Sequence, residues 1–211
     1  VLLRPLPYRD SDQLVMVWGN FQKLGIQRLT AKAAEYEDYR AQDQVFEQVS
    51  AFANESFNTT GADHAERITG ARVTANLFAM LGAQAQQGRG INADENQAGR
   101  DQVVVLSYGF WQRRFGSSEK AIGQTIKLND QNYTVVGVMP SSFQFPHASF
   151  PFGEPAEVWL PLVYPASQLA QREGPYYLNV IARLRTGVSL SQARDQLSAL
   201  GQRFESQYRG Y

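Results

Sequence analysis

The residues of this sequence that could carry nucleophilic or metal chemistry are few and scattered. The chain has no cysteine and two histidines, His64 and His147, and neither histidine has a second ligand at metal-binding spacing such as H-E-x-x-H. Ser107 follows a β-branched run, but its setting, L-S-Y-G, lacks the first glycine of the G-x-S-x-G turn that exposes a catalytic serine. We interpret Ser107 as a helix N-cap and the two histidines as surface residues.

Acidic residues gather at two places without the spacing of a catalytic or metal site. Asp94, Glu95 and Asn96 are consecutive, whereas a calcium loop alternates its ligands and ends in a glutamate twelve positions along. We interpret these three residues as part of a solvated loop. The acidic residues from Glu35 to Asp38 fall early in a predicted helix, where negative charge favours the helix dipole.

Nucleotide-binding motifs are also missing from the sequence. G-R-G at Gly88 to Gly90 is not followed by the further glycine of a dinucleotide loop, and no G-x-x-x-x-G-K-[ST] occurs. We therefore predict no catalytic, cofactor-binding or metal-binding residues, and a chain that is not an enzyme.

The bulk composition narrows the classes of partner. Twenty Lys and Arg balance twenty Asp and Glu, so a net charge of 0 gives no reason to expect nucleic acid or an acidic membrane surface. An apolar content of 43% over 211 residues suits a globular protein whose core needs no disulfides. No apolar run approaches the roughly eighteen residues that a membrane helix needs. The chain starts at Val1 without a methionine, and we expect it to be part of a longer protein.

The stretch from Val103 to Pro140 predicts a compact β-α-β-β module. Val103 to Leu106 is β-branched, Ser107 is placed to cap a helix over Tyr108 to Phe115, and Gly116 is placed to end it.

Two further strand-like runs complete this module, Thr125 to Leu128 and Tyr133 to Met139. The tight polar connection between them begins at Asn129-Asp130. Gly137 inside the second run predicts a bulge or a close backbone approach.

The elements outside the module alternate between strands and helices. We predict strands at 14–18, 51–59, 65–73, 158–160 and 176–184, helices at 30–41, 75–81 and 190–208, a turn or second helix carrying 45–52, a loop at 20–29, and polar linkers at 84–102 and 166–174. The last helix has a capping-box pattern in Ser189 and Gln192. A strand-helix-strand start and a strand-helix finish predict an α+β fold in which a split βαβ sandwich is interrupted by an insertion.

Several segments together resemble the periplasmic core domain of MacB-like ABC-transporter permeases, most closely the large acidobacterial type. The similar segments are VVVLSYGFWQRRFG with IGQTIKLNDQNYTVVGVMP, VLLRPLPY at Val1 to Tyr8, GARVTANLFAMLGAQAQQGRG at Gly70 to Gly90, FQFP at Phe143 to Pro146 and AEVWLPL at Ala156 to Leu162. The resemblance implies a porter-like, ferredoxin-like subdomain at 1–83 and 163–211 and an inserted, mainly-β Sabre-like subdomain at 84–162.

The resemblance also implies a function. We expect a non-catalytic extracytoplasmic domain on the periplasmic side of the bacterial inner membrane. The terminal segments, VLLRPLPY and the helix from Ser189 to Tyr208, would transmit the movement. The implied partners are the membrane-embedded remainder of the permease, indirectly a cytoplasmic ATPase, a periplasmic adaptor and a second copy in a dimer.

Aromatic residues crowd the Pro-rich region that follows the central module. They are Phe143, Phe145, Phe150, Phe152, Trp159 and Tyr164. Two interpretations stay open: packing against the inserted subdomain, or a partner surface, because exposed aromatics concentrate at interfaces. We take Phe150, Phe152 and Tyr164 as candidates for partner contact. The alternative function is a periplasmic binding module for a peptide, lipid or lipoprotein segment.

Overall fold

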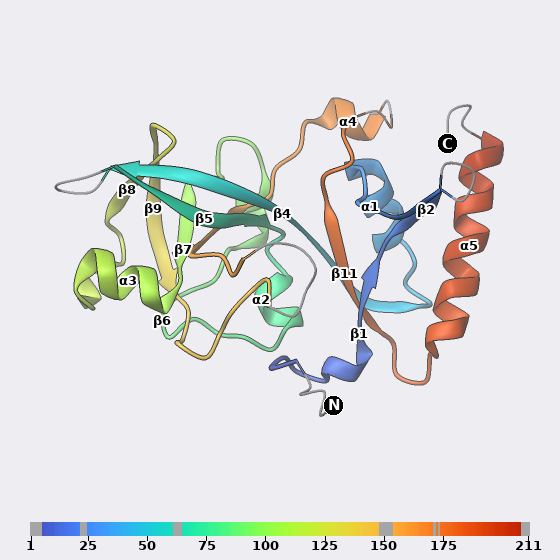
Figure 1. The fold of residues 1–211 in the computed structure, drawn as a ribbon, viewed down its shortest axis with the longest axis horizontal. Helices are drawn as coiled ribbons and strands as arrows, with labels where there is room; N and C mark the ends of the chain where they lie inside the picture. The colour runs from blue at the N-terminus through green and yellow to red at the C-terminus, as the bar shows by residue number, and fades with distance from the viewer. Residues whose placement is uncertain are drawn as a thin grey trace.

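One mixed β-sheet runs through the molecule from one lobe to the other (Figure 1). The computed structural model describes residues 6–21, 25–60, 65–147, 154–170, 172 and 174–207. The strands of this sheet are β1 (Leu14–Val17), β4 (Phe46–Thr60), β5 (Ala65–Val73), β6 (Gln87–Gly88), β7 (Val103–Leu106), β8 (Thr125–Leu128), β9 (Gln131–Val138), β10 (Val158–Pro161) and β11 (Asn179–Leu184). Within the described residues the order is β1-β11-β4-β5-β10-β7-β9-β6, and β8 pairs with both β4 and β9.

The helices lie at both ends of this sheet and between the lobes (Figure 1). They are α1 (Ala33–Arg40), α2 (Leu77–Met80), α3 (Tyr108–Phe115), α4 (Ala166–Ala170) and α5 (Leu190–Gln207), with 3-10 turns at Ser11–Gln13, Ala93–Asn96 and Glu119–Ala121. The pairs β5–β10 and β7–β9 are parallel, and the other pairs of the sheet are antiparallel. A mixed sheet with helices confirms the predicted α+β class.

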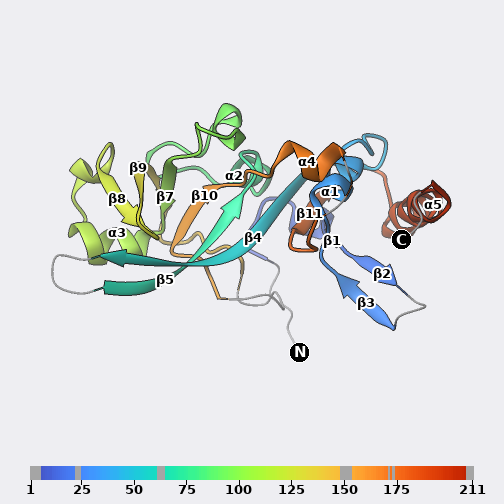
Figure 2. The same cartoon turned by 90° about the horizontal axis from the view of Figure 1, so that it is seen from above.

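Two short elements differ from the prediction. The expected loop at 20–29 contains β2 (Gly19–Phe21) and β3 (Ile26–Leu29), which pair as a separate antiparallel hairpin and project from the body in Figure 2. Gly25 has a φ of 69°, a left-handed conformation that allows the chain to reverse just before β3. The expected linker at 166–174 contains α4.

Strand β4 is the element that joins the two lobes. Its first part, Phe46 to Phe52, pairs with β11, and its second part, Phe52 to Thr60, pairs with β5. The predicted turn or helix carrying 45–52 is therefore wrong. Residues 49–52 are all buried, so this part of the strand lacks the alternation of polar and apolar residues that identifies a half-buried strand. The apolar side chains of the stretch instead fall at three- and four-residue intervals, as they would in a helix.

The buried side chains form three clusters along the sheet. One lies in the lobe of α1 and α5, one lies in the lobe of α3, and the third lies between them around α2. Phe57 of β4 and Ile68 of β5 belong to the α3 cluster, so that lobe takes residues from both sides of Gln84. The division into 1–83 with 163–211 and 84–162 stays a prediction.

The local signals of the central module are confirmed. The Ser107 hydroxyl accepts a hydrogen bond from Phe110 N–H at 3.1 Å, and Gly116 ends α3 with a left-handed φ of 56°. The Ser189–Gln192 capping box is also formed, because Ser189 N–H donates to Gln192 Oε1 at 2.8 Å and Gln192 N–H donates to Ser189 Oγ at 3.3 Å.

Gly137 is both at a register shift and at a close approach. The β7–β9 register shifts between Val104 and Val105, opposite this glycine, and a Cβ on Gly137 would lie 2.0 Å from the carbonyl oxygen of Arg89. Only glycine allows the backbone at Arg89, directly after β6, to lie this close to β9.

We expect Gly137→Ala to lower the free energy of unfolding by about 2 kcal/mol, because the added methyl group must push backbone atoms apart. Gly109→Ala in α3 is the matched control, since a Cβ there meets no atom within 4 Å. The control should be neutral or stabilising by about 0.5–1 kcal/mol, from helix propensity. Urea unfolding of both variants tests this, and equal midpoints would contradict it.

Candidate functional site

The segment from Thr74 to Gly82 contains α2, and we name it the α2 junction. It contacts both lobes and residues 6–10, which we name the N-terminal segment. Figure 1 shows α2 in the middle of the molecule, beside the point where β4 passes between the lobes. Leu77, Phe78 and Met80 are buried in the cluster between the lobes. Burial of these apolar side chains fixes the segment, and hydrogen bonds set its orientation.

Hydrogen bonds attach the start of the α2 junction to β4. Thr74 N–H donates to the Ala51 carbonyl at 3.0 Å, and the hydroxyls of Thr74 and Ser50 are 2.6 Å apart. The side-chain amide of Asn76 donates to the Val49 carbonyl at 2.9 Å. The junction is therefore attached to the half of β4 that pairs with β11.

Asn96 attaches the same segment to the ends of β5 and β10. Its side-chain amide donates to the carbonyls of Val73 at 3.1 Å and Leu162 at 3.0 Å, and its Oδ1 accepts from Ala75 N–H at 2.6 Å. One side chain thus satisfies three backbone groups where the two strands leave the sheet. The predicted interpretation of Asn96 as a solvated loop residue is wrong.

Glu95 is likewise buried rather than solvated. Only 8% of the residue is exposed, and Arg89 forms two charge-assisted hydrogen bonds to its carboxylate, at 2.6 and 2.8 Å. Asn92 N–H adds a capping bond of 2.7 Å to the same group. Burial raises the pKa of Glu95, but these hydrogen bonds outweigh it, so the net pKa lies below its usual value.

The end of the α2 junction is held by a buried arginine from β11. Arg183 is 1% exposed, and its guanidinium donates to the carbonyls of Met80 at 2.7 Å, Arg9 at 2.6 Å and Asp10 at 3.1 Å. Arg9 N–H donates in turn to the Leu81 carbonyl at 3.1 Å. We name this set of contacts the Arg183 clamp, because one side chain joins β11, α2 and the N-terminal segment.

Aromatic side chains surround the N-terminal segment beside the clamp. The Tyr8 hydroxyl donates to the Gln144 carbonyl at 2.6 Å, and burial raises the pKa of this tyrosine. Phe145 and Trp159 are fully buried, and Trp159 Nε1–H donates to the Phe145 carbonyl at 3.1 Å. Phe143 packs against the same cluster. These three aromatic side chains therefore pack in the cluster between the lobes, and their packing against the inserted subdomain stays a prediction.

Of the three predicted partner-contact residues, the structure describes Tyr164. Phe150 and Phe152 lie outside the described residues, as does His64. Tyr164 lies at the contact of α1 and α4, where it is partly buried, its hydroxyl donates to the Glu37 carboxylate and its ring centroid is 6.5 Å from that of Tyr36. Its role as a partner contact stays a prediction.

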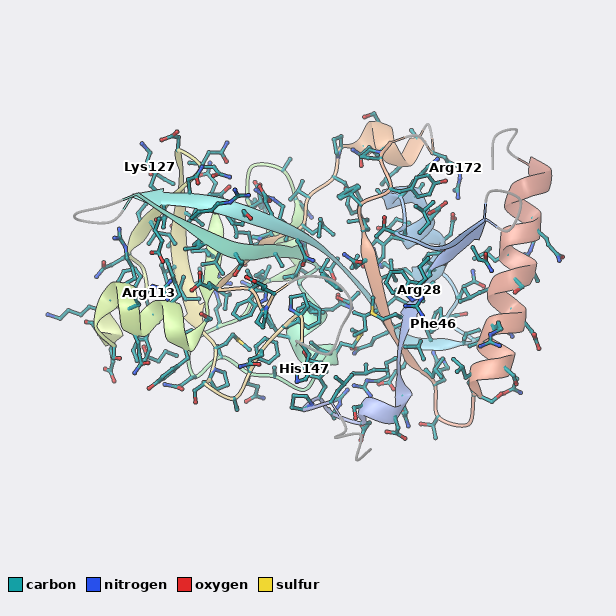
Figure 3. All side chains as sticks on the ribbon, in the orientation of Figure 1. Arg28, Phe46, Arg113, Lys127, His147 and Arg172 are labelled. Atoms are coloured by element: carbon teal, nitrogen blue, oxygen red, sulfur yellow. The ribbon has the colours of Figure 1, made fainter. Side chains whose placement is uncertain are left out.

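The described side chains that we considered for catalysis or metal binding make structural contacts. Ser107 caps α3, and the ring of His147 packs edge-on to Tyr8 beside the N-terminal segment (Figure 3). Among the described residues, no three His, Asp or Glu side chains are grouped so that they could hold a metal ion. No helix in this same part of the chain has the length and apolarity needed to cross a membrane.

Sequence analysis missed Arg183, Glu95 and Asn96. A lone arginine inside the buried run NVIARL was the available signal for Arg183, since a charge in a central strand needs buried partners. For Glu95 the available signal was the capping-box spacing of Asn92 and Glu95, while nothing in the polar stretch 84–102 distinguished Asn96 from its solvated neighbours.

Comparison with known proteins identifies the family. A family model described as the MacB-like periplasmic core domain matches residues 4–200. The chain belongs to this family. It is the periplasmic core domain of a MacB-like ABC permease, and it lies on the periplasmic side of the membrane.

Relatives and solved structures agree with this assignment. Macrolide export ATP-binding/permease protein MacB 1 of Yersinia pestis bv. Antiqua (strain Antiqua) and of Yersinia pseudotuberculosis serotype I (strain IP32953) are each 28% identical over 130 residues, which is 61% of this chain and 19% of theirs. The matched part is thus about a fifth of those relatives.

Two solved structures share the fold. A domain of a putative permease protein from Porphyromonas gingivalis has a TM-score of 0.68 at 17% identity, covering 93% of this chain and 86% of that one. The periplasmic region of MacB from Actinobacillus actinomycetemcomitans has a TM-score of 0.65 at 17% identity, covering 92% and 84%.

The lowered pKa of Glu95 predicts an acid-dependent contribution to stability. A carboxylate whose folded pKa is lowered stabilises the fold above its unfolded pKa of about 4.3, and this contribution disappears as the pH falls through the folded value. Glu95→Gln should therefore cost about 2 kcal/mol at pH 7 and progressively less below about pH 4.

The matched control is Asp94→Asn. The Asp94 side chain is 56% exposed and pairs with Arg100 at 3.2 Å, so its loss should cost less than about 0.5 kcal/mol at either pH. Urea unfolding at pH 7 and at low pH measures both variants. A Glu95→Gln deficit that stays the same at both pH values would show that the ionised carboxylate contributes nothing.

Proposed function

We propose that this domain is non-catalytic and transmits motion between the two ends of the chain through the α2 junction. The observation that carries this proposal is the Arg183 clamp. Its guanidinium binds carbonyls of the N-terminal segment and of α2, and it projects from β11, which is followed by α5. A displacement of the N-terminal segment therefore reaches the strand that leads to the C-terminal helix.

Packing at the other end supports the same route. Ala193 of α5 is buried in the cluster that contains residues of β11, and Leu197 packs against the same cluster, so the helix contacts this lobe through these two side chains. Packed elements of this kind shift between discrete arrangements rather than deforming continuously. The α2 junction, attached to β4 by Thr74 and to β5 and β10 by Asn96, would pass the same displacement to the α3 lobe.

We propose that this motion is part of an export cycle, because the Yersinia relatives are named as export proteins. In such a cycle the membrane-embedded remainder of the permease would connect the domain indirectly to a cytoplasmic ATPase. A periplasmic adaptor and a second copy of the permease are the further partners that we propose. Phe150, Phe152 and Tyr164 are the candidate contacts to them. The alternative of a free binding module has less support, because Phe145 and Trp159 are buried and offer no binding surface.

The proposal predicts uncoupling when the clamp is removed from the full-length permease. Arg183→Met keeps the apolar stem of the side chain and deletes its donors. In cells carrying the permease and its ATPase, we expect export of the cargo to fall about tenfold or more, while ATP hydrolysis by the purified complex stays within about twofold, since coupling free energies of 1–3 kcal/mol correspond to such factors.

Arg113→Met is the matched control. This arginine binds two carboxylates rather than backbone carbonyls, Glu66 at 2.9 Å and Glu157 at 2.7 Å, and it lies on α3 at the far end of the molecule (Figure 3). The control should export normally. Normal export by Arg183→Met at an equal amount of permease in the membrane would contradict the proposal, as would an equal loss of export and ATP hydrolysis.

A further inference from the structure

The N-terminal segment makes a second contact, which leads away from the Arg183 clamp. Tyr8 directly precedes Arg9 and Asp10, whose carbonyls accept the hydrogen bonds of Arg183. The Tyr8 hydroxyl donates to the Gln144 carbonyl at 2.6 Å. Gln144 lies in the loop between β9 and β10, two strands whose side chains belong to the buried cluster of the α3 lobe. Three consecutive residues therefore bond to β11 on one side and to a loop of the α3 lobe on the other.

The Tyr8 side chain is surrounded by aromatic residues of this loop. It is 7% exposed, and its ring centroid lies 6.2 to 6.4 Å from the ring centroids of Phe143, Phe145 and His147. Separation of the loop from Tyr8 would leave a buried hydroxyl and a buried carbonyl without each other, which is unfavourable. We therefore expect Tyr8 and the loop to be displaced together.

The same loop is bonded to β10. The Phe145 carbonyl, directly after Gln144, accepts hydrogen bonds from Ala156 N–H and from Trp159 Nε1–H, each at 3.1 Å. Trp159 belongs to β10, which pairs with β5 and β7. A displacement of Gln144 therefore reaches the sheet of the α3 lobe through the neighbouring residue.

We propose that Tyr8 is a positioning residue that passes displacement of the N-terminal segment directly to the β9–β10 loop. This route joins Arg183 to Phe145 through the N-terminal segment itself, and it runs through neither α2 nor Asn96. The inference rests on the proposed function, because it adds a second route into the α3 lobe for the same motion. The competing account is that the Tyr8 hydroxyl stabilises the loop independently of the Arg183 clamp.

A double-mutant cycle on this 211-residue chain distinguishes the two accounts. Exchange of Ala156 N–H reports separation of the loop from β10, because this amide donates to the Phe145 carbonyl. Arg183→Met loosens the N-terminal segment, which then pulls on the loop through the Tyr8 hydroxyl. This substitution should speed exchange at Ala156 about tenfold, equivalent to about 1.4 kcal/mol. In a chain with Tyr8→Phe, which keeps the ring and deletes the hydroxyl, Arg183→Met should speed the exchange less than about twofold, because the link is absent.

The matched control for the loss of a tyrosine hydroxyl is Tyr133→Phe. Tyr133 is also buried, but its hydroxyl donates to Gln131 Oε1 at 3.0 Å, within the same strand, and links no separate segments. In a chain with Tyr133→Phe, Arg183→Met should keep its full effect on the exchange of Ala156 N–H.

A reference amide detects general loosening of the fold. Asn129 N–H donates to the Asn58 carbonyl at 2.9 Å, where β8 meets β4, and it should exchange at the wild-type rate in all variants. If Arg183→Met does not fold, or also speeds exchange at Asn129, Arg183→Lys replaces it in the cycle, because lysine keeps the charge and removes only part of the donors.

Equal acceleration at Ala156 with and without the Tyr8 hydroxyl would overturn the proposal, because the two contacts would then act independently. Unchanged exchange at Ala156 in the Arg183 variant would overturn it as well. The result is separate from the export measurement. A coupled cycle together with normal export by Arg183→Met would keep the link and reject the proposed function, and an additive cycle together with lost export would do the reverse.

Discussion

The guanidinium of Arg183 is the group around which the central part of this domain is arranged. A positive charge in the middle of a buried strand is tolerated only where acceptors converge on it, and here three backbone carbonyls do so. Those carbonyls come from the N-terminal segment and from the end of α2. The requirement of one charge for partners thus fixes where two otherwise separate segments meet the sheet.

The long strand β4 makes this local arrangement matter for the whole molecule. Because β4 pairs with β11 in one lobe and with β5 in the other, the sheet is continuous across both (Figure 1). Thr74 and Asn76 attach the α2 junction to β4, and Asn96 attaches it to the ends of β5 and β10. Hydrogen bonds to backbone groups, rather than side-chain packing alone, therefore determine how the N-terminal segment, the sheet and the α3 lobe sit together.

Sequence analysis succeeded where the determining interactions are local. Ser107 begins α3 and Gly116 ends it through contacts within a few residues, and Ser189 with Gln192 begins α5 in the same way. These caps could therefore be recognised from the spacing of the residues. Burial on both faces obscured β4, since a central strand loses the alternation that identifies a half-buried one. The Arg183 clamp could not be predicted from local spacing, because the acceptors of Arg183 lie 103 to 174 positions away in the sequence. Glu95 could have been recognised from its capping-box spacing with Asn92, whereas the polar stretch gives no sign that the Asn96 side chain turns inward.

The central claim is that the N-terminal segment moves relative to the α3 lobe during the cycle of the permease. Because this chain has no cysteine, Asp12→Cys in the 3-10 turn beside the N-terminal segment and Lys120→Cys beyond α3 can carry spin labels at two exposed positions without competing sites in the domain. Double electron–electron resonance on the full-length permease, with and without a trapped ATP state of its ATPase, measures the distance between them. The account predicts that the distribution of distances shifts between the two nucleotide states. A single distribution that is identical in both states would contradict it.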